Sequence, residues 1–336
     1  MARLSNFLRK LDGGGFPPAR EESDPLICRP AQRHEIDQAL RLLLAGPNGM
    51  AGEEQVLDFL SFAIQRGVDV NGVWVAARGG RLEWTLLPVV SPGRTMLILT
   101  PTRLLKFTPA SSAAALVREV CRHFAMRDVH LAQLLLDPQE QPVRDLYQSA
   151  GFTELAELVY LSRPIRRTLD IPPPPEGFQL VHYSDPTHEL FMRAITLSYR
   201  NSLDCPALNG LRDMEDVLTG HKAAGEFEPT LWHVLLEGDE PRAVLLLNRS
   251  PNVESLELVY LGLVPEARGR GLGDWMMKLA LGLAARDQKT EISLAVDSRN
   301  APALKLYFRH GLQRVGSRLA MLRDIRHQTT ESPVLA

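Results

Sequence analysis

Hydrophobic and polar residues along the second half of the chain follow two different periods. Alternation with a period of two, or a short apolar run, predicts strands at residues 178–183, 231–237, 242–248, 256–264, 290–296 and 318–324. Apolar residues three to four positions apart predict helices at residues 187–200, 272–286 and 301–311. The charged turn at 238–241 predicts a hairpin, whereas the polar, turn-rich residues 201–230 predict a loop. This order predicts a mixed α/β sheet flanked by helices.

Two segments of the chain repeat each other at a constant offset. Residues 142–152 (PVRDLYQSAGF) align with residues 302–312 (PALKLYFRHGL), so that a proline, a leucine, a tyrosine and a glycine coincide, and Asp137 then coincides with Asp297. Self-similarity of this kind indicates a duplicated fold. We expect the first copy to contain a hairpin at 73–87 and a helix at 113–125.

Proline and glycine runs divide the chain into segments. Four consecutive prolines at 172–175 fix the backbone and remove its donors, which predicts a stiff linker. Three glycines at 13–15, followed by FPP, mark a break between the first domain and an N-terminal arm, which we interpret as a short surface helix or a frayed end. The predicted organisation is an arm (1–28), a first domain (29–165), a linker (166–175), a second domain (176–326) and a tail (327–336).

Charge and cysteine content narrow the class of protein. A net charge of −2 and a pI near 6.5 argue against sequence-independent binding of nucleic acid. Cys28, Cys121 and Cys205 are odd in number and far apart, which fits neither a disulfide framework nor a structural zinc site and indicates a cytoplasmic protein. No apolar run reaches about eighteen residues, so we expect no membrane span and no membrane partner.

The stretch ARGRGLG at 267–273 lies between a predicted strand and a predicted helix. The first N–H groups of a helix lack an intrahelical acceptor and favour an anion, and glycines let a phosphate approach the backbone. A dinucleotide fingerprint has a different glycine spacing, and a Walker loop ends in Gly-Lys-Ser/Thr, which this loop does not. The loop therefore predicts a site for a phosphate or pyrophosphate.

This loop and the segment downstream of it resemble two signatures of the GNAT acyltransferase superfamily. The acyl-CoA-binding pattern R/Q-x-x-G-x-G/A is matched by Arg268, Gly271 and Gly273. The pattern N-x-x-A-x-x-L-Y-x-x-x-G-F, with Leu312 in place of its final Phe, is matched by Asn300, Ala303, Leu306, Tyr307 and Gly311. The resemblance implies an α/β fold class: two tandem GNAT-like domains, each a mixed, mostly antiparallel twisted sheet flanked by helices.

The same resemblance implies a binding site for acetyl-CoA, with no metal. Tyr307 would protonate the leaving thiolate, for which a phenol with a pKa of about 10 is suited. Glu257, at an acidic position often seen on the fourth strand, would take a proton from the attacking ammonium, directly or through water. The residues expected to bind acetyl-CoA are Leu261, Gly262, Leu263, Arg268, Gly269, Arg270, Gly271, Leu272, Gly273, Asn300 and Ala303.

Each assignment has a plainer alternative. Tyr307 could be a core aromatic residue on an amphipathic helix, and Glu257 could face solvent on an alternating strand. Cys205 could be a nucleophile, but no adjacent base is readable, so a small buried apolar role is favoured. His233 lies in an apolar strand and is interpreted as a structural histidine.

The first copy lacks the residues that carry this chemistry. At the same offset, residues 108–113 (TPASSA) replace the glycine loop, Glu140 replaces Asn300 and Leu97 replaces Glu257. We therefore expect a degenerate domain that shapes or covers the acceptor site, or that stabilises its partner.

The residues and the resemblance predict an acetyl-CoA-dependent N-acetyltransferase that acts on a primary amine of a small molecule by direct attack in a ternary complex. The arrangement, with an active second half, resembles that of the mycothiol synthases. We expect the acceptor pocket within residues 201–230, with Asp204, Asn209 and Arg212 as polar contacts. The alternatives are a non-catalytic module that senses acyl-CoA or binds a protein, and an acetyltransferase that acts on a protein amine.

Overall fold

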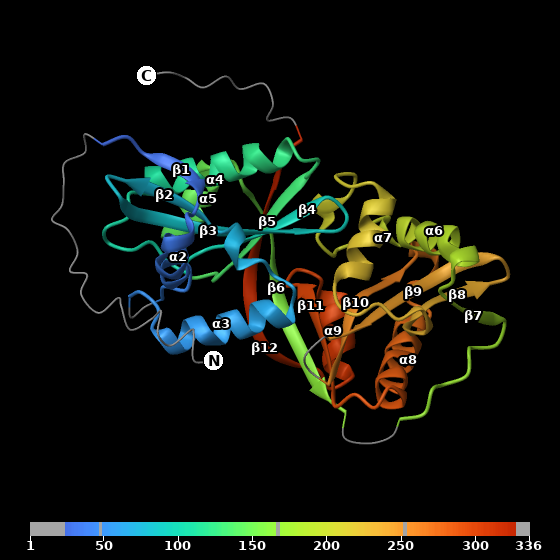
Figure 1. Ribbon diagram of the computed structural model, residues 1–336. Helices are drawn as coiled ribbons and strands as arrows, with labels where there is room; N and C mark the ends of the chain where they lie inside the picture. The colour runs from blue at the N-terminus through green and yellow to red at the C-terminus, as the bar shows by residue number, and fades with distance from the viewer. Residues whose placement is uncertain (1–23, 47–48, 166–168, 251–253, 327–336) are drawn as a thin grey trace.

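A computed structural model describes residues 24–46, 49–165, 169–250 and 254–326 of the chain (Figure 1). Most of the expected N-terminal arm, residues 166–168 of the expected linker and the expected tail lie outside the described residues. Within the described ranges, no helix combines the length and the apolar character that crossing a membrane requires.

The strands of both halves join in one twelve-stranded sheet, in the order β1-β2-β3-β4-β5-β12-β6-β11-β10-β9-β8-β7. Neighbouring strands are antiparallel except for two parallel pairs, β4 with β5 and β10 with β11. This mixed, mostly antiparallel sheet confirms the predicted fold class. The strands are β1 (Ile27–Pro30), β2 (Trp74–Arg78), β3 (Arg81–Ser91), β4 (Thr95–Leu99), β5 (Leu131–Leu136), β6 (Thr153–Pro164), β7 (Phe178–His182), β8 (Trp232–Glu237), β9 (Glu240–Arg249), β10 (Ser255–Leu263), β11 (Glu291–Asp297) and β12 (Gln313–Asp324).

Helices cover both faces of the sheet in the second half (Figure 1). Ala243, Leu245 and Leu247 of β9 pack in the cluster that contains α8, and Val244 and Leu246 pack in the cluster that contains α6 and α7. This two-sided burial explains why that run is apolar at every position. The helices are α2 (Ile36–Leu43), α3 (Glu53–Gln65), α4 (Ala110–Ala125), α5 (Gln141–Ser149), α6 (His188–Tyr199), α7 (Met214–Ala223), α8 (Leu272–Arg286) and α9 (Ala301–Arg309).

The same order of elements occurs twice along the chain. The series β2, β3, β4, α4, β5, α5, β6 corresponds to the series β8, β9, β10, α8, β11, α9, β12. In each series the parallel pair is short, because β4 pairs with β5 only at Thr95–Leu97 and β10 pairs with β11 only at Ser255–Glu257. The structure therefore agrees with the duplication that the sequence offset indicates.

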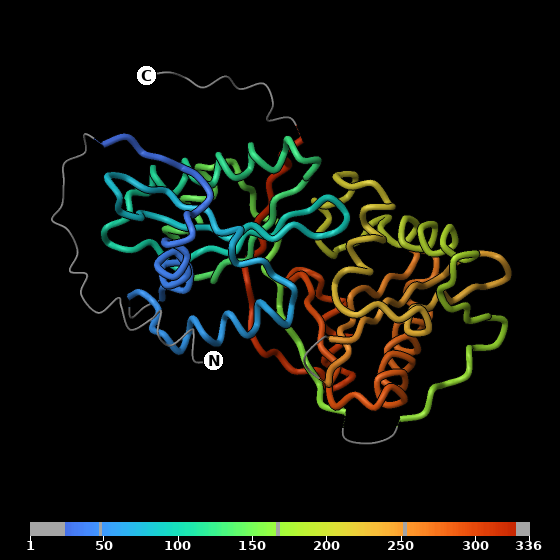
Figure 2. Tube along the Cα trace, viewed as in Figure 1, coloured from blue at the N-terminus to red at the C-terminus, as the bar shows by residue number. Residues whose placement is uncertain are grey.

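The last strand of each half is exchanged between the halves. β12 lies between β5 and β6, and β6 lies between β12 and β11. Figure 2 shows the red C-terminal segment running back into the first half of the molecule. The two halves therefore complete each other's sheet. The expected division into two domains at the proline run does not account for this exchange of strands.

The structure also contains helices that the sequence pattern does not predict. Residues 201–230, expected as a loop, contain α7, whose buried residues are Val217 and Leu218. Two buried positions in ten residues give too weak a periodicity to distinguish a helix from a polar loop. In the first half, α2 and α3 were likewise not predicted.

Candidate active site

A pocket of about 630 Å³ lies where β10 separates from β11, next to the N-terminus of α8. Its walls come from β10, the glycine loop, α9 and the segment that follows α6. The lining residues are Ser198, Asn201, Ser202, Leu203, Asp204, Leu258, Val259, Tyr260, Leu261, Gly262, Leu263, Arg268, Gly269, Gly271, Gly273, Asp274, Ala295, Val296, Asn300, Pro302, Ala303, Leu306, Tyr307 and Arg309. The structure thus brings most of the sequence-predicted site residues together.

The pocket opens because two parallel strands diverge. The pairing of β10 with β11 ends at Glu257 and Ser293, while β10 continues to Leu263 and stays paired with β9. A register shift between Leu258 and Tyr260 bends β10 at this point. Residues 258–263 therefore present an edge that β11 does not cover, and a ligand can lie along it.

The glycine loop leaves a run of backbone donors unused. Among the described residues, no oxygen accepts a hydrogen bond from the amide nitrogens of residues 269–274. Gly269 and Gly271 have φ values of +75° and +79°, in the left-handed region, and a Cβ at either position would meet no described atom within 4 Å. Gly271 precedes α8 and no described side chain caps that helix. These amides and the helix dipole form an open anion site.

The guanidinium groups of the two arginines in the loop have partners within the protein. Arg268 lines the pocket, but its guanidinium donates to the carbonyl oxygens of Ser198, Arg200, Asn201 and Leu263 at 2.8–3.2 Å. It therefore caps the C-terminal end of α6. The Arg270 guanidinium turns away to pair with Glu237 at 2.6 Å and lies over the ring of Phe178. Of this loop, the backbone therefore remains open to an anion, while both guanidinium groups are bonded to other residues.

Asn300 and Ala303 shape the opposite wall. Asn300 precedes α9, and its Oδ1 accepts a hydrogen bond from the amide of Ala303 at 3.3 Å. Because Asn and Asp are favoured at helix N-termini, this cap explains why the second signature begins with Asn. Leu272, in contrast, is buried in the core beneath α8 and does not line the pocket.

Tyr307 lies on α9 with its ring in the core and its edge in the pocket wall. Among the described residues its hydroxyl has no hydrogen-bond partner, so it is available to a ligand. Burial raises the pKa of this hydroxyl, and the Asp204 carboxylate adds to the rise. Tyr307 is therefore protonated at neutral pH and can donate a proton.

Glu257 lies beside the pocket rather than in its lining. Leu256 and Leu258 pack in the cluster beneath α8, so Glu257 between them points to the opposite face of the sheet. Desolvation by burial raises the pKa of the Glu257 carboxyl, although the side chain reaches solvent, and Arg66 of the first half partly offsets the rise. The pocket lining therefore includes Tyr307 but not Glu257.

The three predicted acceptor contacts lie in different places. Asp204 lines the pocket, and its Oδ1 accepts from the amide of Asp297 at 3.3 Å. Asn209 ends a short 3₁₀ turn and does not line the pocket. Arg212 lies against the turn between β3 and β4, where its Nη2 donates to the carbonyl of Asp216 at 2.6 Å. Only Asp204 of the three therefore faces the pocket.

The two remaining candidates have the environments of structural residues. Burial raises the pKa of the Cys205 thiol to about 12, which leaves almost no thiolate at neutral pH. Burial lowers the pKa of His233 to about 4, so its imidazole is neutral within β8. Neither residue lines the pocket. These environments suit the structural interpretation.

Several pocket residues have no signal in the sequence pattern. Ser198, Ser202, Leu203, Asp274 and Arg309 reach the pocket from helix ends and a loop, where no periodicity marks a ligand-facing position. The coincidence of Asp137 with Asp297 has a structural reason instead. Asp137 directly follows β5 and Asp297 ends β11, and each accepts a hydrogen bond from the amide two residues later, at 3.0 and 2.9 Å.

The corresponding residues of the first half are buried. Tyr147, at the position that corresponds to Tyr307, is fully buried and packs edge-on against Phe152. Pro109 precedes α4, and Ser112 in its first turn is fully buried. The first half therefore keeps the helix start and the tyrosine of the second half but not the glycines of its loop.

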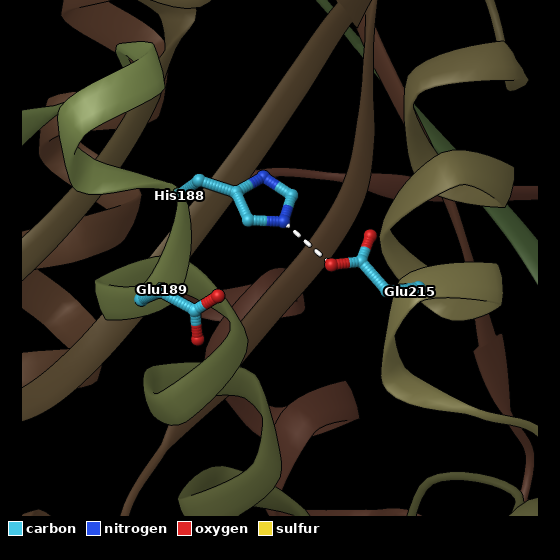
Figure 3. Close-up of side chains that lie close together, drawn as sticks. All are labelled: His188, Glu189 and Glu215. Atoms are coloured by element: carbon cyan, nitrogen blue, oxygen red, sulfur yellow. Dashed lines mark hydrogen bonds and ion pairs between the residues drawn. The ribbon is translucent and has the colours of Figure 1, made fainter.

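One group of the described residues has the spacing of a metal site: His188, Glu189 and Glu215 (Figure 3). The imidazole of His188 is already bonded at both nitrogens, because Nε2 contacts Glu215 at 2.8 Å and Nδ1 contacts the hydroxyl of Tyr183 at 2.8 Å. Lys222 donates to the same hydroxyl at 2.7 Å and places a positive charge beside the group. These contacts explain the cluster as a network of hydrogen bonds at the protein surface.

Parts of this chain are similar in sequence to known acetyltransferases. Residues 200–312 match the model of the acetyltransferase (GNAT) family. The chain is 31% identical over 176 residues to the mycothiol acetyltransferase of Streptomyces bingchenggensis, a match that covers 50% of this chain and 54% of that protein. It is 32% identical over 88 residues to the mycothiol acetyltransferase of Jonesia denitrificans, covering 25% of this chain and 28% of that protein. The matches therefore span about half and about a quarter of these curated relatives.

A solved structure shares the fold. The GCN5-related N-acetyltransferase from Sphaerobacter thermophilus aligns with a TM-score of 0.57 over 90% of this chain and 96% of its own, at 15% sequence identity. At this identity the likeness concerns the fold alone.

Proposed function

Because this chain belongs to the GNAT superfamily, with two such folds in tandem, we propose that it is an acetyl-CoA-dependent N-acetyltransferase. The second half transfers the acetyl group to a primary amine of a small molecule. Both curated relatives are mycothiol acetyltransferases, which supports acetyl as the transferred group and a small molecule as the acceptor.

The observation that carries this proposal is the run of unused amides at residues 269–274 beside the diverging strands β10 and β11. A pyrophosphate fits a helix start with exposed N–H groups, and an extended pantetheine arm fits the open edge of residues 258–263. Tyr307 lies in the same pocket, so a thioester bound along that edge would have a proton donor near it.

The proposed reaction has one bond-forming and one bond-breaking step. The neutral amine attacks the thioester carbonyl carbon, and the carbon–sulfur bond then breaks to release coenzyme A. Tyr307 donates its phenolic proton to the departing sulfur, which its raised pKa permits. Glu257 first accepts one proton of the incoming ammonium through water, since it lies on the other face of β10. The second proton that the nitrogen loses as the amide forms restores the Tyr307 phenol.

The test is a titration of acetyl-CoA into the full chain and two variants at one position. Gly271→Glu places a side chain and a negative charge at the anion site, and Gly271→Ala introduces the same strain at φ +79° without the charge. We expect the glutamate variant to bind at least about tenfold more weakly than the alanine variant, by calorimetry. Equal affinities of the two variants would place the pyrophosphate elsewhere.

Turnover is tested separately from binding. Release of free thiol from acetyl-CoA in the presence of a panel of small amines supports the transferase. Tight binding without thiol release for any amine, including amines on proteins, would instead support a module that senses acyl-CoA.

A further inference from the structure

A turn of the first half contacts the segment that forms one wall of the pocket. Arg94, between β3 and β4, donates from Nε to Asp216 at 2.8 Å and from Nη2 to Asp213 at 2.7 Å. Asp213 directly precedes α7, and Asp216 lies in its first turn. The Asp216 side chain is 13% exposed and that of Asp213 is 74% exposed, so the pair with Asp216 is the stronger contact.

The backbone of this turn is shaped for close approach. Arg94 has a φ of +55°, a left-handed conformation that costs a non-glycine residue about 1 kcal/mol. A Cβ on Gly93 would lie 2.3 Å from the carbonyl oxygen of Asp216, so only glycine fits at that position. The Arg94 carbonyl accepts from the amide of His130 at 2.8 Å, which fixes the turn to the start of β5.

Residues 201–213 connect this contact to the pocket. Ser202, Leu203 and Asp204 line the pocket, and the following residues cross the exchanged strands. There Cys205, Leu208 and Leu211 pack on Leu155, Ala156, Ala320 and Leu322 of β6 and β12.

The segment is anchored at both ends and near its middle. The second half holds its start, where Arg268 donates to the Asn201 carbonyl at 2.9 Å, and its middle, where Asp297 contacts Asp204 and Cys205. The first half holds its end through Arg94, which donates to Asp213 and, in the first turn of α7, to Asp216. Without that last anchor, the residues after Cys205 would keep their apolar contacts on β6 and β12, turns of their own and the hydrogen bond from Arg212 to the carbonyl of Asp216.

We propose that Arg94 is a positioning residue, through which the first half holds residues 201–213 against the acceptor side of the pocket. The inference rests on the proposed function for what the pocket binds. Through this contact the first half, which lacks the glycine loop, would position one wall of the pocket for the reaction. The ion pair is not needed to join the halves, because β6 and β12 already join them within one sheet.

The experiment compares amide hydrogen exchange in the full-length wild type, Arg94→Gly, Arg94→Lys and Arg122→Ala, with and without acetyl-CoA. Arg94→Gly removes the guanidinium and also relieves the left-handed strain, so the fold is retained. Arg122→Ala is the control, because Arg122 pairs with Glu119 on its own helix in the first half.

We expect residues 201–213 to exchange about tenfold faster in Arg94→Gly and to recover in part in Arg94→Lys. Exchange in β9 and in the Arg122→Ala control stays at the wild-type rate. The affinity for acetyl-CoA stays within about twofold, because the amides of residues 269–274 are untouched. With an amine that is turned over, the KM for that amine rises about fivefold and kcat stays within about twofold.

Two results would overturn the positioning role: unchanged exchange at residues 201–213 in Arg94→Gly, or faster exchange spread equally over β6 and β12. A wild-type chain that does not bind acetyl-CoA rejects the proposed function instead. Binding and thiol release therefore test the proposed function, and hydrogen exchange tests the positioning role.

Discussion

At the scale of single residues, Tyr307 and Tyr147 show how one side chain acquires different roles in two copies of a fold. Both lie on the helix that precedes the last strand of their half. Tyr147 is fully buried, whereas the wall around Tyr307 opens into the pocket. The difference comes from the surroundings and not from the residue itself.

We expect Tyr307→Phe to lower kcat roughly a hundredfold, because the thiolate would leave without a proton from the protein. Acetyl-CoA affinity is expected to stay unchanged, since the ring keeps its packing. Thiol release and calorimetry measure the two quantities, with Tyr147→Phe as the matched substitution in the first half. A Tyr307→Phe enzyme with wild-type kcat would remove Tyr307 from the mechanism.

A buried histidine near the pocket predicts how stability depends on pH. Burial lowers the pKa of His221 from 6.5 to about 4, with a contribution from Arg212, and its ring stacks on Tyr260. Between these two pH values the unfolded chain binds more protons than the folded chain, so stability is full above pH 6.5 and falls as the pH approaches 4.

His221→Phe removes this proton uptake while it keeps a ring beside Tyr260. We expect the midpoint of thermal unfolding in the variant to fall less between pH 7 and pH 5 than in the wild type. Part of the dependence remains, because the pKa of His233 is also lowered to about 4. Parallel pH curves for variant and wild type would contradict this origin.

At the scale of elements, β10 carries both the pocket edge and a close contact with α6. A Cβ on Gly262 would lie 2.6 Å from the hydroxyl oxygens of Ser198 and Tyr260, which are hydrogen-bonded to each other at 2.8 Å. The glycine at this position therefore reflects the close packing of α6 on the strand.

We expect Gly262→Ala to destabilise the protein by about 1–3 kcal/mol, because the strand and α6 must move apart. The control is Gly316→Ala on β12, where a Cβ would meet no described atom within 4 Å. Urea unfolding of both variants measures the difference. Equal stabilities would show that β10 yields to the extra methyl without cost.

Elements differ in how far the sequence predicts them. The hydrophobic periods give β8, β9, β10, α8, β11 and α9 close to their observed bounds, since each of these elements packs apolar side chains in one core cluster. The period cannot reveal α7, which buries only two side chains, nor the extension of β12 back to Gln313, where the residues are largely exposed. The same limit applies to the site: the glycine motif predicts the amides, but the partners of Arg268 and Arg270 depend on contacts distant in sequence.

At the scale of the whole molecule, strand exchange makes the two halves one folding unit. β6 belongs to the first half in sequence and pairs with β11, and β12 belongs to the second half and pairs with β5. A prediction of two separable domains follows from the proline run, but no local pattern states which strands will be neighbours across a sheet.

We expect a single cooperative transition in calorimetry, because neither half can lose its core without unpairing a strand of the other. The fragments 1–170 and 171–336 should not fold when produced singly, and should fold together when mixed. Two resolved transitions, or a stable monomeric fragment 171–336, would contradict this coupling.

The place of β12 also sets the order in which the protein can be completed during its synthesis. The strand that β5 requires as its neighbour is Gln313–Asp324, close to the C-terminal end of the described chain. A nascent chain therefore carries an unfinished sheet edge at β5 until nearly all of these residues have left the ribosome. A premature stop before Gln313 would damage the half that was translated first.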